Sequence, residues 1–279
     1  MLINLTAKAR WWAIALTALT VVLALVLGPN PVTPAQPTAK QPGAEVKQPA
    51  KEAPLQFSKA KLEAAVDGWV SVHSGTYGVT LMDKQGRTLA TAGAEESFFA
   101  ASIYKLYVAY IGYQKVDDKT YSLDEPYLGG YSRGKCLDTM IRESHSPCAE
   151  KMWAELGREQ LTKQLKTYGL KNTDMNNLST TSYDAAVILA RIERGEGLSN
   201  VSRKAYLDSL AGQIYRSALP VGFTNAKVYN KVGFNGYVEY HDTAIVRLGD
   251  GRSLIVSVLT RNVGTKNIAG LARAIQATL

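Results

Sequence analysis

The sequence predicts an α+β fold, in which an antiparallel five-stranded sheet with flanking helices is accompanied by a helical lobe. Three observations predict it. Segments of alternating apolar and polar residues occur at both ends of residues 57–279, the stretch from about 107 to 214 reads as helices and loops, and helical periodicity marks both ends of the region. Strands joined by short turns form antiparallel sheets, so both ends of the region are expected to build one sheet.

Each end of this region contributes its own strands and one covering helix. The segment "SKAKLEAAVDGWV" places Leu62, Val66 and Trp69 at helical spacing, with Ser58 as a suitable N-cap. Two strands are expected next, in "TYGVTLMD" and "RTLATA", joined by the turn residues "KQG". After the helical block, strands are expected in "AKVYNKVG", "DTAIVRLG" and "RSLIVSVLT", and the final segment "NIAGLARAIQATL" carries one apolar helical stripe.

The first 56 residues do not read as part of the folded domain. Residues 1–28 contain the uncharged run "WWAIALTALTVVLALVL", which follows Lys8 and Arg10 and has the minimum length of a bilayer-spanning helix. Residues 29–56 hold seven of the ten prolines, which favours an extended, disordered linker. We therefore expect a signal anchor and an extracytoplasmic domain tethered to the membrane. A cleaved signal peptide is the alternative.

Charge and cysteine content indicate which partners, cofactors and cross-links to expect. The net charge of +8 comes without a basic run interleaved with aromatic residues, so a nucleic-acid partner is not expected. Cys136 and Cys148 lack the spacing of a metal site, and no metal or organic cofactor is expected. In an exported domain the two cysteines favour a disulfide, although two buried free thiols would also fit.

Two serines stand in patterns typical of nucleophiles. Ser102 and Lys105 form an S-x-x-K pair in the apolar segment "FFAASIYKLYVAY", and on a helix a neutral lysine three residues on could take the serine's proton. Ser132 stands in "GYSRG", which matches G-x-S-x-G. That motif needs a strand before the serine, and "SLDEPYLG" reads as loop instead. None of the three histidines, His73, His145 and His241, has metal-ligand spacing.

Three segments in order resemble the penicillin-recognising serine hydrolases, most closely the class A β-lactamases. These segments are "FFAASIYKLY", "CLDTMIRESHSPCAEKMW" and "VYNKVGFNGYVEYHDTAIV". They occupy the places of the family's S-x-x-K, S-D-N and K-T-G motifs, and the resemblance covers about residues 57–279. It implies the β-lactamase/penicillin-binding-protein fold and a β-lactam or peptidoglycan peptide as substrate.

The resemblance also implies a role for each matching residue. Ser102 would attack an amide carbonyl and form an acyl-enzyme, and Lys105 would accept its proton. Ser144 would pass a proton to the leaving nitrogen, and Lys231 would hold Ser144 and attract the substrate carboxylate. The backbone N–H groups of Ser102 and Phe234 would form the oxyanion hole. In the family-like arrangement, Cys136 precedes the Ser144 loop and Cys148 follows it.

The sequence departs from the family pattern at two substrate-binding positions. Ser146 replaces the asparagine of S-D-N, and "Ser-Pro" at this place also fits a helix N-cap followed by proline. Val232 replaces the threonine of K-T-G before Gly233, so it cannot donate the threonine's hydroxyl hydrogen bond. Both changes alter the expected recognition of the substrate.

A third departure concerns the step that releases the acyl group. Class A enzymes carry a loop glutamate that activates the deacylating water, but "GLKNTDMNNLSTTSYDAA" contains none. Asp174 is the nearest acid and the one candidate for that role. The sequence therefore predicts a β-lactamase-like serine hydrolase that releases product slowly. A D,D-carboxypeptidase or endopeptidase acting on peptidoglycan is one alternative, and a non-catalytic wall-binding or sensor module is another.

Overall fold

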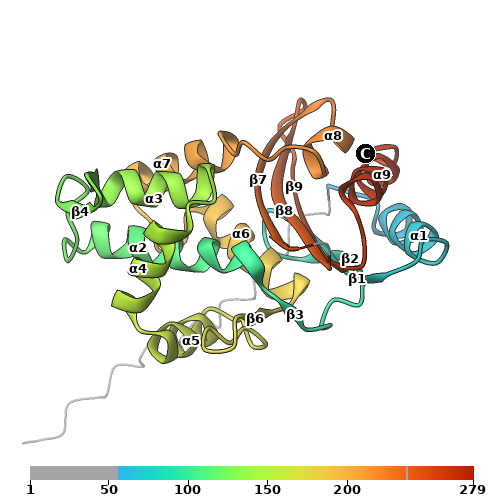
Figure 1. Cartoon of the computed structure of the whole chain (residues 1–279). Coiled ribbons are helices and arrows are strands. Elements are labelled where there is room, and N and C mark those ends of the chain that lie inside the picture. The colour runs from blue at the N-terminus through green and yellow to red at the C-terminus, as the bar shows by residue number, and fades with distance from the viewer. Residues whose placement is uncertain (1–55, 237) are drawn as a thin grey trace, which may run out of the picture. The chain divides into compact units, whose positions relative to one another are not determined.

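The computed structural model describes residues 56–236 and 238–279. The predicted anchor and nearly all of the predicted linker lie outside these residues. Within the described part of the chain, no helix combines the length and the apolar character that a membrane span needs. The described residues form one compact unit with a helical lobe beside a sheet (Figure 1).

A five-stranded sheet forms the frame, and its strand order is β2-β1-β9-β8-β7. Every neighbouring pair is antiparallel, as the sequence predicts. The first two strands pair with the last three because β1 lies against β9, so both ends of the domain meet in one sheet. The strands are β1 (Thr76–Asp83), β2 (Thr88–Ala92), β7 (Ala226–Asn235), β8 (Glu239–Leu248) and β9 (Ser253–Arg261).

Both faces of the sheet are buried, and strand β9 shows why. Leu254, Val256 and Val258 pack with the helices α1 (Lys59–Val70) and α9 (Thr265–Gln276). Ile255 and Leu259, which alternate with them, belong to a second apolar cluster shared with the helical lobe. In Figure 1, α1 and α9 lie on the far side of the sheet from the lobe. The sheet is therefore a rigid middle layer to which the site can be fixed.

The helical lobe follows the first two strands and is built around α2. Its core is the second apolar cluster, and the aromatic side chains of Tyr107, Tyr110 and Tyr206 are fully buried in it. The helices are α2 (Tyr104–Asp117), α3 (Arg133–Arg142), α4 (Ser146–Leu156), α5 (Arg158–Thr167), α6 (Ser182–Arg194) and α7 (Asn200–Ala211), with a short α8 (Leu219–Gly222) leading back to the sheet.

Two short ladders within the lobe were not foreseen from the sequence. Strand β3 (Phe98–Phe99) pairs with β6 (Ser179–Thr180), and β4 (Pro126–Leu128) pairs with β5 (Tyr131–Ser132). Strands of two or three residues are too short to show an alternating pattern, which is why the sequence reads as loop there. The β3–β6 ladder matters for the site because it holds the loop before α6 against the segment that leads into Ser102.

Candidate active site

Ser102 lies where the chain passes from the sheet into the helical lobe. It is the middle residue of a 3₁₀ turn, η1 (Ala101–Ile103), which continues directly into α2. The residue before it, Ala101, has a left-handed backbone with φ of 43°. Such a conformation is costly for a residue with a side chain and tends to persist at functional sites. Ser102 lines a cavity of about 390 Å³.

Strand β7 approaches the backbone of Ser102 closely at Gly233. A Cβ atom at Gly233 would lie 3.1 Å from the backbone nitrogen of Ser102 and 3.1 Å from the carbonyl oxygen of Ala100. A side chain at this position would therefore crowd the backbone of Ser102, and glycine avoids that contact. The next residue, Phe234, lines the same cavity as Ser102. The two predicted oxyanion-hole residues thus lie on adjoining segments of backbone.

Lys105 is buried on the first turn of α2 and points toward the loop between α3 and α4. Its Nζ donates to the carbonyl oxygen of Ser144 at 2.6 Å and to Oγ of Ser146 at 2.9 Å. Burial lowers the pKa of Lys105 to about 8, and the negative charge of Glu150 partly offsets that effect. A neutral amine has two N–H groups, so these two acceptors leave its lone pair free to accept a proton.

Ser144 lies between the two lysines. Nζ of Lys231 donates to Oγ of Ser144 at 2.9 Å, and Nζ of Lys105 lies 3.4 Å from the same oxygen. Lys231 also donates to the carbonyl oxygen of Val232 at 2.8 Å. Ser144 has a left-handed backbone, with φ of 58°, which turns the chain between α3 and α4. The structure therefore brings Lys105, Ser144 and Lys231 together. Ser146, which binds Lys105, lines the same cavity as Ser102, but among the described residues no hydrogen bond joins Oγ of Ser102 to this group.

Lys231 is completely buried, and its surroundings decide its charge. Burial lowers its pKa well below the usual value, the charge of Lys105 lowers it further, and Asp242 raises it. Asp242 pairs with Val232 across the β7–β8 ladder and accepts from Nδ2 of Asn230 at 2.9 Å. Burial raises the pKa of Asp242 to about 7. An ionised Asp242 thus favours a positive charge on Lys231, where a substrate carboxylate is expected.

A disulfide fixes the loop that carries Ser144. Cys136 in α3 and Cys148 in α4 are bonded, with 5.1 Å between their Cα atoms. The predicted bridge is confirmed, and the alternative of two free thiols is wrong. His145, not Ser146, is the N-cap of α4, because Nδ1 of His145 accepts from the backbone nitrogen of Cys148. The interpretation of Ser146 as an N-cap is therefore wrong, and its hydroxyl is left to bind Lys105.

Other predicted residues lie apart from this group. Oγ of Ser132 caps α3 by accepting from the backbone nitrogen of Lys135, which is a structural role. Val232 is buried and does not line the Ser102 cavity. Ring nitrogens of His73 and His241 bond to backbone carbonyl oxygens. Among the described residues, no group of three His, Cys, Asp or Glu side chains could hold a metal ion.

The predicted water-activating acid is engaged in a turn. The carboxylate of Asp174 accepts from the backbone nitrogen of Asn176 and from Nδ2 of Asn177, both at 2.8 Å, and does not line the Ser102 cavity. These bonds hold its pKa below the usual value. Leu178 of the same loop lines the cavity instead and has a left-handed backbone, with φ of 51°. Its carbonyl oxygen accepts from the backbone nitrogen of Ala100 at 2.6 Å.

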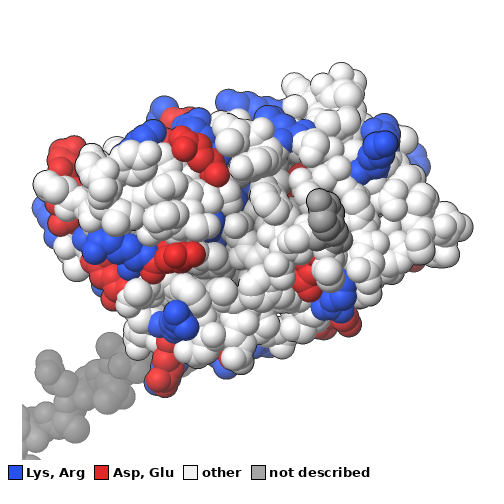
Figure 2. Space-filling view, viewed as in Figure 1, with Lys and Arg blue, Asp and Glu red and all other residues white. Residues whose placement is uncertain are grey.

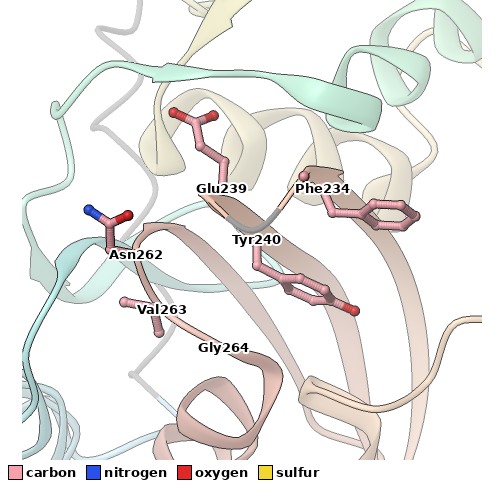
Figure 3. Close-up of a pocket in the computed structure, with 7 residues that line it drawn as sticks. Phe234, Glu239, Tyr240, Asn262, Val263 and Gly264 are labelled. Atoms are coloured by element: carbon pink, nitrogen blue, oxygen red, sulfur yellow. The ribbon is translucent and has the colours of Figure 1, made fainter.

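A second, larger cavity of about 480 Å³ lies beside the β7–β8 hairpin. Figure 3 shows that the rings of Phe234 and Tyr240 lie on one side of this hairpin, whereas Glu239 points to the other. Phe234 lines both cavities and is 44% exposed, so it forms the ridge between them. Among the described residues, no serine or lysine lines the second cavity, so it lacks the candidate nucleophile of the Ser102 cavity.

Comparison with known proteins places this geometry in a family. Residues 61–279 match the beta-lactamase enzyme family, and no curated protein matches the chain in sequence. The fold is similar to that of PBP-A (23% identity, TM-score 0.69, 77% of this chain and 95% of that one). It is also similar to a PBP-A mutant solved as an acyl-enzyme complex with penicillin G (22% identity, TM-score 0.71, 80% and 98% covered). A β-lactamase from Desulfarculus baarsii DSM 2075 is similar too (18% identity, TM-score 0.70, 79% and 98% covered). These identities support the fold, while the family match extends over most of the sequence. The chain belongs to the beta-lactamase enzyme family, with the class A β-lactamase-like serine hydrolase fold.

Proposed function

We propose that this protein is a serine hydrolase that opens β-lactams, or cleaves related peptidoglycan peptides, through an acyl-enzyme on Ser102. The observation that carries the proposal is the position of Ser144, whose hydroxyl receives a hydrogen bond from Lys231 and lies within reach of Lys105. This arrangement connects a proton acceptor beside the nucleophile to a proton donor for the leaving nitrogen.

The first step uses the neutral form of Lys105. Its lone pair takes the proton of Ser102, and Oγ of Ser102 bonds to the carbonyl carbon of the substrate. The oxyanion that forms receives hydrogen bonds from the backbone N–H groups of Ser102 and Phe234. Because Lys105 has a pKa of about 8, roughly a tenth of it is neutral at pH 7, so it can act as a base without large cost.

The second step breaks the carbon–nitrogen bond. Ser144 donates its proton to the leaving nitrogen and recovers one from the protonated Lys105. Lys231 orients Ser144 through its hydrogen bond. A bound substrate carboxylate would favour the protonated form of Lys231, which would in turn attract that carboxylate. The relay thus moves one proton in total from Ser102 to the leaving nitrogen, restores Lys105 and Ser144, and leaves the acyl group on Ser102. Penicillin G is a suitable first probe because the PBP-A mutant of similar fold is an acyl-enzyme complex with it.

Release of the acyl group is proposed to be slow. The loop that would supply a glutamate presents Leu178 to the cavity, and Asp174 is bonded within its own turn. Water attack then depends on Lys105, once it has returned to its neutral form. A general base contributes about 100- to 10,000-fold to such a step, so its loss is sufficient for adduct to accumulate.

The test is intact-mass analysis of residues 56–279 after mixing with penicillin G. We expect a mass increase equal to one penicillin, located on Ser102, that forms in seconds to minutes and decays more slowly. Ser102→Ala is the matched control and should gain no mass. Rapid turnover without an adduct would contradict slow release. Neither adduct nor turnover, in folded protein, would favour a wall-binding module instead.

Attack on peptidoglycan peptides is the alternative within the same mechanism. A peptide ending in two D-alanines would lose its last residue by the same steps, with Lys231 attracting its terminal carboxylate. Release of D-alanine at a rate above that of penicillin turnover would make peptides the better substrate class.

We also propose that the protein acts outside the cytoplasm and is held at the membrane. The uncharged run at residues 11–27 supports an anchor, and the bond between Cys136 and Cys148 fits an oxidising compartment. Native protein should sediment with membranes and resist alkaline extraction. A soluble form that begins after Gly28 would show cleavage instead.

A further inference from the structure

Two charged side chains line the Ser102 cavity and have no use in the mechanism above. Glu150 lies in α4, and Arg158 is the first residue of α5. Among residues 56–236 and 238–279, neither side chain has an ion-pair or hydrogen-bond partner. Glu155 and Glu159 of the same helices pair with Arg133 and Lys163, whereas Lys151 and Lys166 have no ion-pair partner among the described residues either. Glu150 and Arg158 differ from those two lysines because they line the cavity. The cavity therefore holds one unpaired carboxylate and one unpaired guanidinium.

The helix α4 aims Glu150 at the cavity. Ser146, Glu150 and Trp153 are spaced by four and then three residues, so they share one face of the helix, and all three line the cavity. Ser146 on this face binds Lys105. The charge of Glu150 is also felt by Lys105 and by Tyr104, both of whose pKa values it raises. Glu150 thus faces the cavity from the same side of α4 as Ser146, within electrostatic reach of Lys105.

The guanidinium of Arg158 is held in place by an aromatic ring. It stacks over Trp153 with 4.0 Å between its central carbon and the ring centroid, and Trp153 is itself buried against Tyr104. Stacking leaves the N–H edge of a guanidinium free, and this edge matches a carboxylate in a bidentate pair. In Figure 2, basic and acidic side chains gather over α4 and α5 beside the hollow that separates the lobe from the sheet.

We propose that this cavity is a subsite for an acyl-side group that carries both an ammonium and a carboxylate. Glu150 would bind the ammonium, and Arg158 the carboxylate. In a wall peptide, such a group is the free end of a diamino dicarboxylic acid. A cavity of about 390 Å³ has room for such a side chain. The inference rests on the proposed function, since it names the acyl group that Ser102 would receive.

Three cephalosporins with the same acetoxymethyl nucleus separate the two charges. Cephalosporin C carries an aminoadipyl side chain with ammonium and carboxylate. Adipyl-7-aminocephalosporanic acid lacks only the ammonium, and cephalothin has an uncharged side chain. The measurement is the second-order rate of acylation of Ser102 by intact mass. We expect cephalosporin C to react fastest and cephalothin slowest. Each charged group of the side chain should raise the acylation rate about tenfold, because a hydrogen bond to a charged group contributes a free energy of this order.

Each single variant should remove the rate difference that depends on one charge of the cephalosporin side chain. Glu150→Gln should bring the ratio of cephalosporin C to the adipyl compound close to one. Arg158→Gln should bring the ratio of the adipyl compound to cephalothin close to one. Glu159→Gln and Lys163→Gln are matched controls on the exposed face of α5, and they should keep the wild-type ratios. Equal acylation by all three compounds would overturn the subsite but uphold the acyl-serine mechanism.

Two further results are decisive. If Glu150→Gln instead slows adduct release equally for all three compounds, Glu150 is the water-activating base, and the subsite is overturned. If no compound acylates the protein, the proposed function fails, and calorimetric binding to Ser102→Ala then tests the subsite alone. Tighter binding of cephalosporin C than of cephalothin, by tenfold or more, would still support it. Equal binding would refute it.

Discussion

The two walls of the Ser102 cavity differ in the polar side chains that they carry and in the hydrogen bonds of those side chains. On the wall made by α2, the α3–α4 loop and β7, each polar group of Lys105, Ser144 and Lys231 has a partner within hydrogen-bond distance. On the wall made by the loop before α6, the side chain that faces the cavity is Leu178, and the acid of that loop, Asp174, is bonded within its own turn.

This difference separates the two halves of a hydrolase reaction. The first wall holds the groups proposed to form the acyl-enzyme, including a lysine whose pKa is lowered by burial. Among the described residues, the second wall presents Leu178 but no carboxylate to the cavity. Under the proposed function, a chain of this fold could keep its acylating groups while lacking the loop glutamate that releases the acyl group.

Removing the acylating pair should have the largest effect. Ser102→Ala and Lys105→Met are each expected to reduce acylation by penicillin G about 10,000-fold or more, because each removes a member of one catalytic unit. Lys105→Met also leaves the carbonyl of Ser144 without its partner, so thermal unfolding must be measured for each variant. The double variant should be little worse than either single one. Losses that multiply would show that the two residues do not act together.

Adding a base to the second wall should have the next largest effect. Leu178→Glu places a carboxylate on the residue of this loop that lines the cavity, and we expect adduct release to accelerate by about 100-fold or more. Leu178→Gln is the control, because it matches the shape of glutamate but cannot accept the proton. Release rates are read from the decay of the adduct mass after excess penicillin is removed. Equal rates for the two variants would show that the position cannot reach the ester.

Local patterns account for what the sequence could predict. Strand alternation and short turns identified the five-stranded sheet, and the S-x-x-K spacing identified Ser102 and Lys105. The N-cap of α4 was assigned to Ser146 by residue preference, whereas the disulfide-bonded loop places His145 there. The cavity wall depends on contacts between distant segments, such as the bond from Ala100 to the carbonyl of Leu178. No local pattern marks Leu178, Glu150 or Arg158 as neighbours of Ser102.

The pH dependence of acylation should report the first wall. Only neutral Lys105 can take the proton, and burial has lowered its pKa to about 8. Its neutral fraction rises from about a tenth at pH 7 to about nine tenths at pH 9, so acylation should rise roughly tenfold, with a midpoint near 8. Because the charge of Glu150 raises this pKa, Glu150→Gln should move the midpoint lower. A profile that falls between pH 7 and pH 9 would contradict a neutral lysine as base.

The smallest expected effect on adduct release is that of Asp174, the acid of the second wall. If Asp174 activated water, Asp174→Asn would slow adduct release by 100-fold or more. Its carboxylate instead accepts from Asn176 and Asn177, and those bonds hold its pKa low, which makes it a weak base. We therefore expect Asp174→Asn to change the release rate by less than about twofold. It should lower the free energy of unfolding by about 1 kcal/mol, because an amide replaces only part of the carboxylate's hydrogen bonds. Chemical denaturation and adduct decay measured on the same protein separate the two effects. If Asp174→Asn released the adduct 100-fold more slowly than the wild type at unchanged stability, Asp174 would be the water-activating base. The second wall would then also carry a catalytic group.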